Sequence, residues 1–192
     1  MPIIKYKNMI KTATKKPVFG VSDLTNQNIP QNYAKKILHE LSKTGRITRI
    51  ERGKYTTLDD TYIVATHLTE PCYLSMWSAL SIHKLTTQIP FSLEIVTTRK
   101  RFNRKIMYKN TPIIFYTAQP EMMYGYENMV WKEDIRIPVA KPEKIIVDAL
   151  YFKTISVEDL NEIINMVNKK ILVSYAKLTK NNFVIKTVEG MI

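Results

Sequence analysis

Apolar positions near the start of the chain follow a helical period. They recur every three or four residues, with lysines between them: Ile3, Tyr6, Ile10 and Ala13. This spacing predicts an amphipathic helix over residues 3–13, which Pro17 and the two lysines before it end. Gly20 or Ser22 can cap a short second helix that carries Asp23 and Leu24.

The third predicted helix has the clearest pattern in the chain. One stripe is apolar at spacings of three, four and seven: Ala34, Ile37, Leu38 and Leu41. The opposite side is polar and cationic, with Lys35 on its flank: Asn32, Lys36, His39 and Lys43. Gly45 stands where a left-handed residue commonly ends a helix.

A short cationic hairpin is predicted directly after this helix. Arg46–Ile50 and Lys54–Thr57 are strand-like, and Glu51-Arg52-Gly53 between them is typical of a turn. Three helices with a tight second connection, followed by a hairpin, predict a winged helix-turn-helix domain over residues 1–58.

Residues 59–192 predict a second, mixed domain, so the fold class is α+β. After a short junction at 58–61, helices are expected at 62–68, 73–85, 142–152, from Ser156 onward, and last at 174–182. Strands are expected at 93–98 and 111–117, joined by a cation-rich loop or hairpin, with two more within 127–140. The helix that starts at Ser156 should bury Val157, Leu160, Ile164 and Val167.

Charge is concentrated in the first domain. The chain has 29 Lys and Arg against 17 Asp and Glu, and residues 1–57 hold 12 of those cations but only three acids. This imbalance favours a polyanionic partner. Cys72 is the only cysteine, which excludes an intrachain disulfide, and no signal-peptide core or long apolar run occurs, so we expect a cytoplasmic protein without membrane contact.

The third helix and the hairpin together form a candidate DNA surface. Carboxamides can pair with adenine edges, so Gln31 and Asn32 are candidates for base readout. Phosphate contacts are expected from the remaining polar residues of the helix and from the hairpin cations: Tyr33, Lys35, Lys36, His39, Lys43, Arg46, Arg49, Arg52 and Lys54. Two alternatives stay open: the lysines solvate an exposed face, or the domain binds protein or RNA.

No residue pattern points to catalysis. His39, His67 and His83 lack metal-ligand spacing, and His83 is expected to be a hydrogen-bonded core residue. Phosphate-binding glycine loops are absent, and the paired carboxylates fall at predicted element ends, where capping explains them. We therefore expect no catalytic residue, no metal and no cofactor. The segment Tyr124-Gly125-Tyr126 indicates a partly exposed loop or a partner interface.

Several segments, in this order, resemble the antitoxins of abortive-infection system E, the AbiEi family. The resemblance covers most of the chain and rests on structural rather than catalytic motifs. In the first domain they are PVFGVSDL and YAKKILHELSKTGRITRIERGKYT, and in the second YLSMWSALSIHKLTTQIP, LEIVTTRKR and KPEKIIVDAL.

The resemblance implies a DNA-binding antitoxin with an AbiEi-like C-terminal α/β domain. Such a protein represses its own operon at upstream inverted repeats and counteracts a co-encoded nucleotidyltransferase-like toxin. It would be a monomer or weak dimer in solution, with two copies on DNA. A second basic face would correspond to Arg99, Lys100, Arg101, Arg104 and Lys105, together with Lys109. An orphan transcriptional regulator, a protein- or RNA-interaction module and, least favoured, a nuclease remain alternatives.

Overall fold

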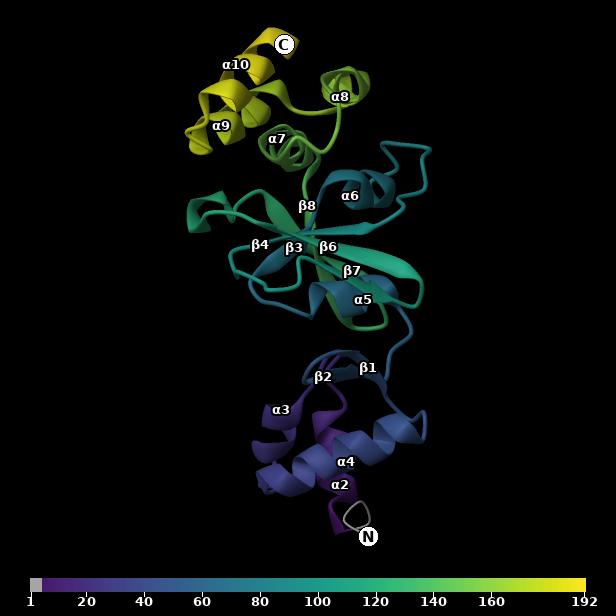
Figure 1. Ribbon diagram of the computed structural model, residues 1–192. Coiled ribbons are helices and arrows are strands. Elements are labelled where there is room, and N and C mark those ends of the chain that lie inside the picture. The colour runs from purple at the N-terminus through teal and green to yellow at the C-terminus, as the bar shows by residue number, and fades with distance from the viewer. Residues whose placement is uncertain (1–4) are drawn as a thin grey trace. The chain divides into compact units, whose positions relative to one another are not determined.

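The protein is an α+β chain of two compact units. The computed structural model describes residues 5–192. N-terminal helices and a two-strand hairpin are followed by a mixed six-strand sheet with further helices (Figure 1). The first unit extends to Leu68 and includes Met107–Lys109, and the second comprises Thr69–Ile106 and Asn110–Ile192. A boundary at residue 58 stays a prediction, and each unit is described by itself.

Three helices form the body of the first unit. They are α2 (Lys7–Ala13), α3 (Val21–Thr25) and α4 (Gln31–Lys43). The predicted apolar stripe of α4 is fully buried, and it packs with Ile10, Phe19, Leu24 and Ile29 in one core. These helices confirm the sequence pattern, except that α2 begins at Lys7; residues 3 and 4 of the predicted helix lie outside the described part of the chain.

The end of α4 confirms the role expected of Gly45. Its backbone is left-handed, with φ of 70°. The Gly45 amide donates to the carbonyl of Ser42 at 3.1 Å, and the Arg46 amide donates to that of Leu41 at 3.0 Å. Two carbonyls at the end of the helix thereby gain partners, and the chain turns toward the hairpin.

The hairpin consists of β1 (Thr48–Glu51) and β2 (Lys54–Thr56) around a turn at Arg52-Gly53. The expectation that the first strand begins at Arg46 is wrong, because the Arg46 amide is used in the helix ending. The strand pairing shifts between Arg49 and Glu51. Ile50 is the extra residue at this shift. It explains why Ile47 and Ile50, which would lie on opposite faces of an ideal strand, are buried and half-buried respectively.

Backbone contacts fix the hairpin to the helices of its unit. Phe19 and Tyr55 exchange two amide–carbonyl bonds of 2.9 and 2.8 Å. The Thr56 hydroxyl donates to the Pro17 carbonyl at 2.6 Å. A Cβ at Gly20 would lie 2.3 Å from the Gly53 carbonyl oxygen, so only glycine allows this approach. The hairpin is therefore held in place by the segment between α2 and α3.

A short helix, α5 (Thr61–Thr66), ends the first unit. The Asp60 carboxylate accepts bonds from the amides of Tyr62 and Ile63, at 3.0 and 3.2 Å. These contacts confirm the capping role expected of the paired carboxylates, and the helix begins one residue before the expected residue 62.

The second unit is built on a sheet of order β5-β6-β4-β3-β8-β7. The strands are β3 (Cys72–Leu74), β4 (Leu93–Thr97), β5 (Lys105–Tyr108), β6 (Thr111–Thr117), β7 (Tyr126–Lys132) and β8 (Ile135–Ala140). β3 pairs antiparallel with β4 and parallel with β8, while β4 and β6 are parallel and β7 and β8 antiparallel. The cation-rich connection after β4 therefore leads into a hairpin, β5–β6, as expected.

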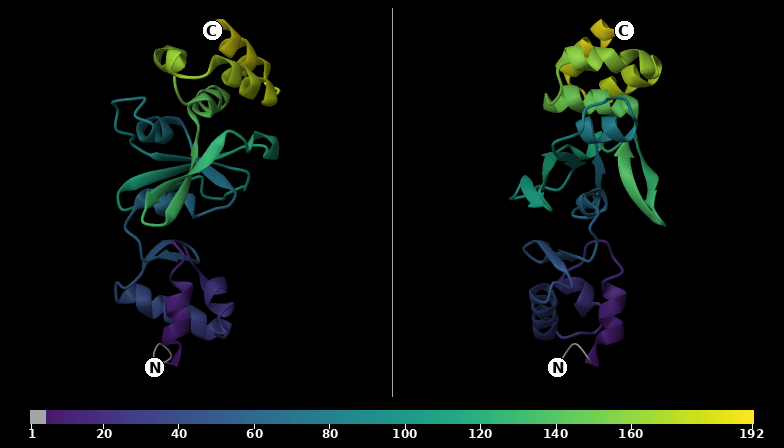
Figure 2. Two further views of the ribbon diagram at one scale, coloured as in Figure 1. Left: turned by 180° about the vertical axis from the view of Figure 1, so that it is seen from behind. Right: turned by 90° about the vertical axis from the view of Figure 1, so that its right-hand side faces the viewer.

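Helices of the second unit gather on one side of this sheet (Figures 1 and 2). They are α6 (Met76–Ile82), α7 (Pro142–Phe152), α8 (Val157–Ile163), α9 (Lys169–Leu178) and α10 (Asn182–Met191). Short 3-10 turns at Pro120–Met122 and Ile164–Met166 complete the unit. α7 is buried nearly all round, because α6, α9 and α10 pack against it.

Two helix predictions in this unit are wrong in part. The segment 73–85 contributes Tyr73 and Leu74 to a buried strand, and the helix begins only after Ser75. The expected last helix at 174–182 is instead two helices, separated at 179–181. The core face predicted for the helix after Ser156 is confirmed only in part. Leu160 of α8 and Ile164 of the following 3-10 turn are buried, whereas Val157 and Val167 are half-buried and Val167 lies beyond both elements.

Candidate nucleic-acid interface

The polar face of α4 is open to solvent along its whole length. The predicted helix residues are all exposed: Gln31, Asn32, Tyr33, Lys35, Lys36, His39 and Lys43. Since the apolar stripe holds the opposite side in the core, the orientation of α4 is fixed by burial. Tyr33 is 50% exposed, and its ring centroid lies 6.3 Å from that of Tyr6 on the same unit.

Three of the four cations predicted for the hairpin are exposed to solvent, although Arg46 precedes β1. Arg46, Arg49 and Arg52 are exposed. Lys54 is half-buried, and its ammonium donates to the carbonyl of Leu68 and lies 3.7 Å from the Glu51 carboxylate. Lys54 therefore stabilises its own unit, and the exposed charge of the hairpin comes from the arginines.

A hollow of about 360 Å³ connects the two elements. His39, Ser42 and Lys43 of α4 line one side, and Arg49 and Tyr55 of the hairpin line the other. Ser42 and Tyr55 were missed in the sequence, where no local signal brings them together. Donors from both elements face this hollow, which suits a bound oxyanion such as phosphate.

The cations of α4 have few acidic neighbours. Asp23 is paired with Lys16 at 2.6 Å, and Glu51 lies beside Lys54. Within residues 5–192, Lys35, Lys36 and Lys43 form no ion pair. Glu40 stands on the same helix, four residues after Lys36, but it makes no ion pair with these lysines. The lysine charges therefore remain available to an anionic partner.

The second basic cluster lies in the connection between β4 and β5. Arg99, Lys100, Arg104 and Lys105 are exposed. Arg101 is half-buried, with its guanidinium carbon 4.0 Å from the centroid of the Phe115 ring. This connection also exposes Phe102, which is not among the predicted site residues.

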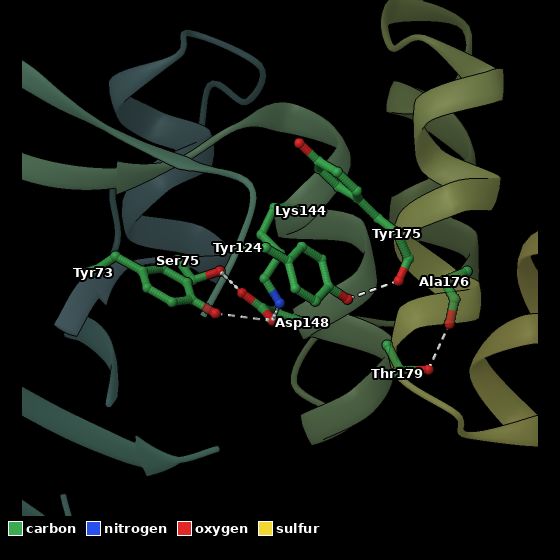
Figure 3. Close-up of polar contacts among 8 residues, drawn as sticks. All are labelled: Tyr73, Ser75, Tyr124, Lys144, Asp148, Tyr175, Ala176 and Thr179. Carbon is green, nitrogen blue, oxygen red and sulfur yellow. Dashed lines mark hydrogen bonds and ion pairs between the residues drawn. The ribbon is translucent and has the colours of Figure 1, made fainter. Parts of the chain in front are cut away.

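A third group of polar residues lies in the second unit (Figure 3). The Lys144 ammonium donates to the Asp148 carboxylate at 2.6 Å, and the hydroxyls of Ser75 and Tyr73 donate to it at 2.8 and 3.4 Å. Lys144 also lies 4.3 Å from the centroid of the Tyr124 ring. These contacts join β3 and α7 to the loop before β7.

Burial of this cluster shifts the pKa values of its ionisable groups and separates them from solvent. Burial raises the pKa of Asp148 and lowers that of Lys144, while their mutual contact opposes both shifts. Burial also raises the pKa of Tyr73 well above its usual value, with the Asp148 charge adding to the effect. Lys144, Asp148, Ser75 and Tyr73 are all fully buried, so the cluster reaches no surface, and we assign it a structural role.

Two further sequence expectations concern residues near this cluster. The partly exposed segment expected at Tyr124–Tyr126 is confirmed, because all three residues are half-buried, and a partner interface there stays a prediction. Contacts within the unit hold the segment: the Tyr124 hydroxyl donates to the Tyr175 carbonyl at 2.7 Å, and the Tyr126 ring stacks on Tyr73 at 4.7 Å. Gly125 is needed there, because a Cβ would lie 2.6 Å from the Tyr175 ring. His83 is hydrogen-bonded as expected, at 2.8 Å from the Ala140 carbonyl.

Across residues 5–192, no three His, Cys, Asp or Glu side chains are close enough to hold a metal ion. In the same range no helix combines the length and apolarity needed to cross a bilayer.

Comparisons with known proteins assign no family. No family model matches the chain, and no curated protein matches it. Among solved structures, the chain is similar to the crystal structure of the RV2827C protein from Mycobacterium tuberculosis, with 12% identity and a TM-score of 0.46. The match covers 97% of this chain and 80% of the other. A likeness at this level carries no argument about function.

Proposed function

We propose that the protein is a sequence-specific DNA-binding repressor and antitoxin. In this proposal the first unit is a winged helix-turn-helix, with α4 as recognition helix and the β1–β2 hairpin as wing. The observation that carries it is the joint exposure of the polar face of α4 and the hairpin arginines, with the hairpin fixed to the helices by backbone contacts. A rigid basic surface of this kind fits a duplex better than a flexible basic tail does.

Helix α4 and the β1–β2 hairpin would make different kinds of contact with the duplex. The side chains of Gln31 and Asn32, in the first turn of α4, would read base edges in the major groove. The lysines of α4 and the hairpin arginines would contact phosphates and fix the register. The hollow between His39, Lys43 and Arg49 is a suitable place for one backbone phosphate.

The antitoxin part of the proposal rests on the resemblance to the AbiEi family. It implies a co-encoded nucleotidyltransferase-like toxin, counteracted by the C-terminal unit, and inverted repeats bound by two copies of this chain. An orphan regulator would share the DNA surface and lack the toxin.

Nuclease protection on the DNA upstream of the gene tests the repressor role. We expect two protected half-sites whose centres are separated by about one helical turn, 10–10.5 base pairs, or a multiple of it. Uniform or absent protection would contradict sequence-specific binding. Co-expression with the adjacent gene tests the antitoxin role separately: rescue of growth supports it, and continued toxicity in the presence of the protein refutes it.

A further inference from the structure

The connection between β4 and β5 displays an aromatic ring in the middle of a cationic segment. Phe102 has a relative exposure of 102%, the highest of the large apolar side chains in the described chain. Five cations and no acid stand in residues 99–105 around it: Arg99, Lys100, Arg101, Arg104 and Lys105. Phe91 and Ile89 are also highly exposed, but their segment has no such charge.

Side chains and backbone hold this connection on both sides of Phe102. Before it, the Arg99 Nε donates to the Glu70 carbonyl at 2.9 Å, and the Arg101 guanidinium packs over the Phe115 ring. After it, the Arg104 carbonyl accepts from the Phe115 amide at 2.8 Å. The tip formed by Phe102 and Asn103 is thus supported by β6 and by the segment before β3. A ring presented this way loses little conformational freedom when a ligand covers it.

The exposed Phe102 ring and the surrounding cations together indicate the chemistry of a matching ligand. The cations require a polyanion, and an uncovered aromatic face pairs well with another planar ring. Nucleic acid supplies both, but in an intact duplex each base is already stacked on its neighbours. The matching ligand is therefore a nucleic acid with unpaired or unstacked bases, held by cations along its backbone and by stacking on an aromatic side chain.

We propose that residues 98–105 form a second nucleic-acid site, at which Phe102 stacks on an unpaired base. Arg99, Lys100, Arg104 and Lys105 contact the flanking phosphates, while Arg101 stays against Phe115 and positions the tip. An anionic membrane is a weaker match, because Phe102 is the only apolar side chain in this segment and stable membrane anchoring takes more than one such signal. The site goes beyond duplex recognition by α4 and uses none of its residues.

Titration of the full chain with a fluorescent oligothymidylate tests this site, together with an oligonucleotide that carries 2-aminopurine as stacking probe. We expect Phe102→Ala to weaken binding by on the order of tenfold, and to abolish the change in 2-aminopurine fluorescence that stacking causes. Phe102→Trp should retain both. Phe91→Ala is the matched control, since it removes an exposed ring of the same unit outside the cationic segment.

Salt dependence separates the ring from the cations. Lys100→Ala should lower the salt slope by about 0.7, the value for one phosphate contact on a single strand, whereas Phe102→Ala should leave the slope unchanged. Equal affinity of Phe102→Ala and the parent chain would overturn the proposal. So would binding to vesicles of phosphatidylserine and phosphatidylcholine without binding to the oligonucleotide.

The α4 surface is tested apart from this site. The variant Arg49→Ala/Arg52→Ala should lose duplex binding and keep the Phe102-dependent fluorescence change. Loss of that change in the double variant would assign single-strand binding to the first unit and overturn the second site. Failure of the duplex proposal alone leaves the oligothymidylate result intact.

Discussion

Individual side chains carry the proposed sequence readout. Asn32 is exposed in the first turn of α4 and has no structural role there, because the core contacts of this helix come from its opposite side. Its carboxamide can donate to and accept from one adenine edge at the same time, which no aliphatic residue can do. The residue is therefore suited to a test that separates recognition from folding.

Asn32→Ala should weaken a specific operator by about 1–3 kcal/mol and random DNA much less, because the lost contact is to a base. Competition titrations of both duplexes with the parent and variant chains measure the difference. Asn165→Ala, at an exposed asparagine of the second unit, is the matched control and should leave both affinities unchanged. Equal weakening on both duplexes would remove Asn32 from base readout.

Glu94 shows how burial at one residue sets a pH dependence of stability. Its carboxylate accepts from the Ser78 amide at 3.2 Å, and burial raises its pKa to about 7, against these stabilising bonds. The pKa of Glu94 is near 4.5 in the unfolded chain and about 7 in the folded protein. At pH values between these two, the folded state therefore holds the Glu94 proton more tightly than the unfolded state does. The contribution of Glu94 to stability is thus full below pH 4.5 and is lost as the pH rises through 7.

Glu94→Gln should therefore stabilise the protein more at pH 8 than at pH 5, by on the order of 2 kcal/mol. Urea unfolding at both pH values measures this change in the free energy of unfolding. Glu162→Gln, at an exposed glutamate, serves as control and should show no such difference. A gain of the same size at both pH values would mean that Glu94 titrates normally.

At the scale of elements, the hairpin depends on a close backbone approach. Gly20 precedes α3, and its amide donates to the Asp23 carboxylate at 2.8 Å. Its Cα side faces the Gly53 carbonyl, which belongs to the hairpin turn. A Cβ at residue 20 would meet this backbone carbonyl, which no change of side-chain rotamer can move away.

Gly20→Ala should displace the hairpin and lower the free energy of unfolding by about 1–3 kcal/mol. Thermal or urea unfolding measures this loss. Gly190→Ala is a sharp control, since a Cβ there meets no atom within 4 Å and the residue lies in α10, so the substitution should stabilise by about 0.5–1 kcal/mol. An unchanged stability of Gly20→Ala would show that the turn and α3 are not in close contact.

The hairpin arginines make a separate prediction about phosphate contact. Arg52→Ala should weaken binding to all duplex sequences similarly and lower the salt slope by about one. Lys170→Ala removes one exposed charge from the second unit and should change neither quantity. An unaltered slope for Arg52→Ala would place the hairpin away from the DNA backbone.

The sequence predicts best those helices and strands whose formation depends on residues close together in the chain. The α4 stripe, Gly45 and the Asp60 cap act within a few residues, and each was found from the sequence. Tyr73 and Leu74 were assigned to a helix because a short run buried on both faces has no period, and only pairing with β4 and β8 makes it a strand. The hollow beside Ser42 and Tyr55 likewise depends on contacts distant in sequence.

The basic cluster between β4 and β5 shows the same limit at a candidate site. Its cations could be read from the sequence, whereas the inward turn of Lys54 and the packing of Arg101 on Phe115 could not, because partners distant in the chain decide them. Phe102 stood within the cationic run, and an aromatic residue in such a run is itself a signal for stacking on bases. The structure adds its complete exposure.

At the scale of the whole molecule, charge is divided unevenly between the two units. The first unit holds 13 cations and five acids, a net charge of +8, and the second unit holds 16 cations and 12 acids, a net charge of +4. The proposed duplex surface lies on the first unit, which has the larger net charge. The second unit has one local cationic segment and a buried ion pair between Lys144 and Asp148. Binding to duplex DNA should have two components, a salt-dependent attraction and a sequence preference.

The most direct test of the central claim is a titration of the full chain onto duplex DNA from its own upstream region and onto a scrambled duplex, each at several salt concentrations. Base readout by α4 predicts a preference for the upstream duplex of about a thousandfold or more, which persists as salt weakens the binding to both duplexes. Equal and steeply salt-dependent affinities for the two duplexes would contradict it, because a basic surface without base readout binds every sequence alike.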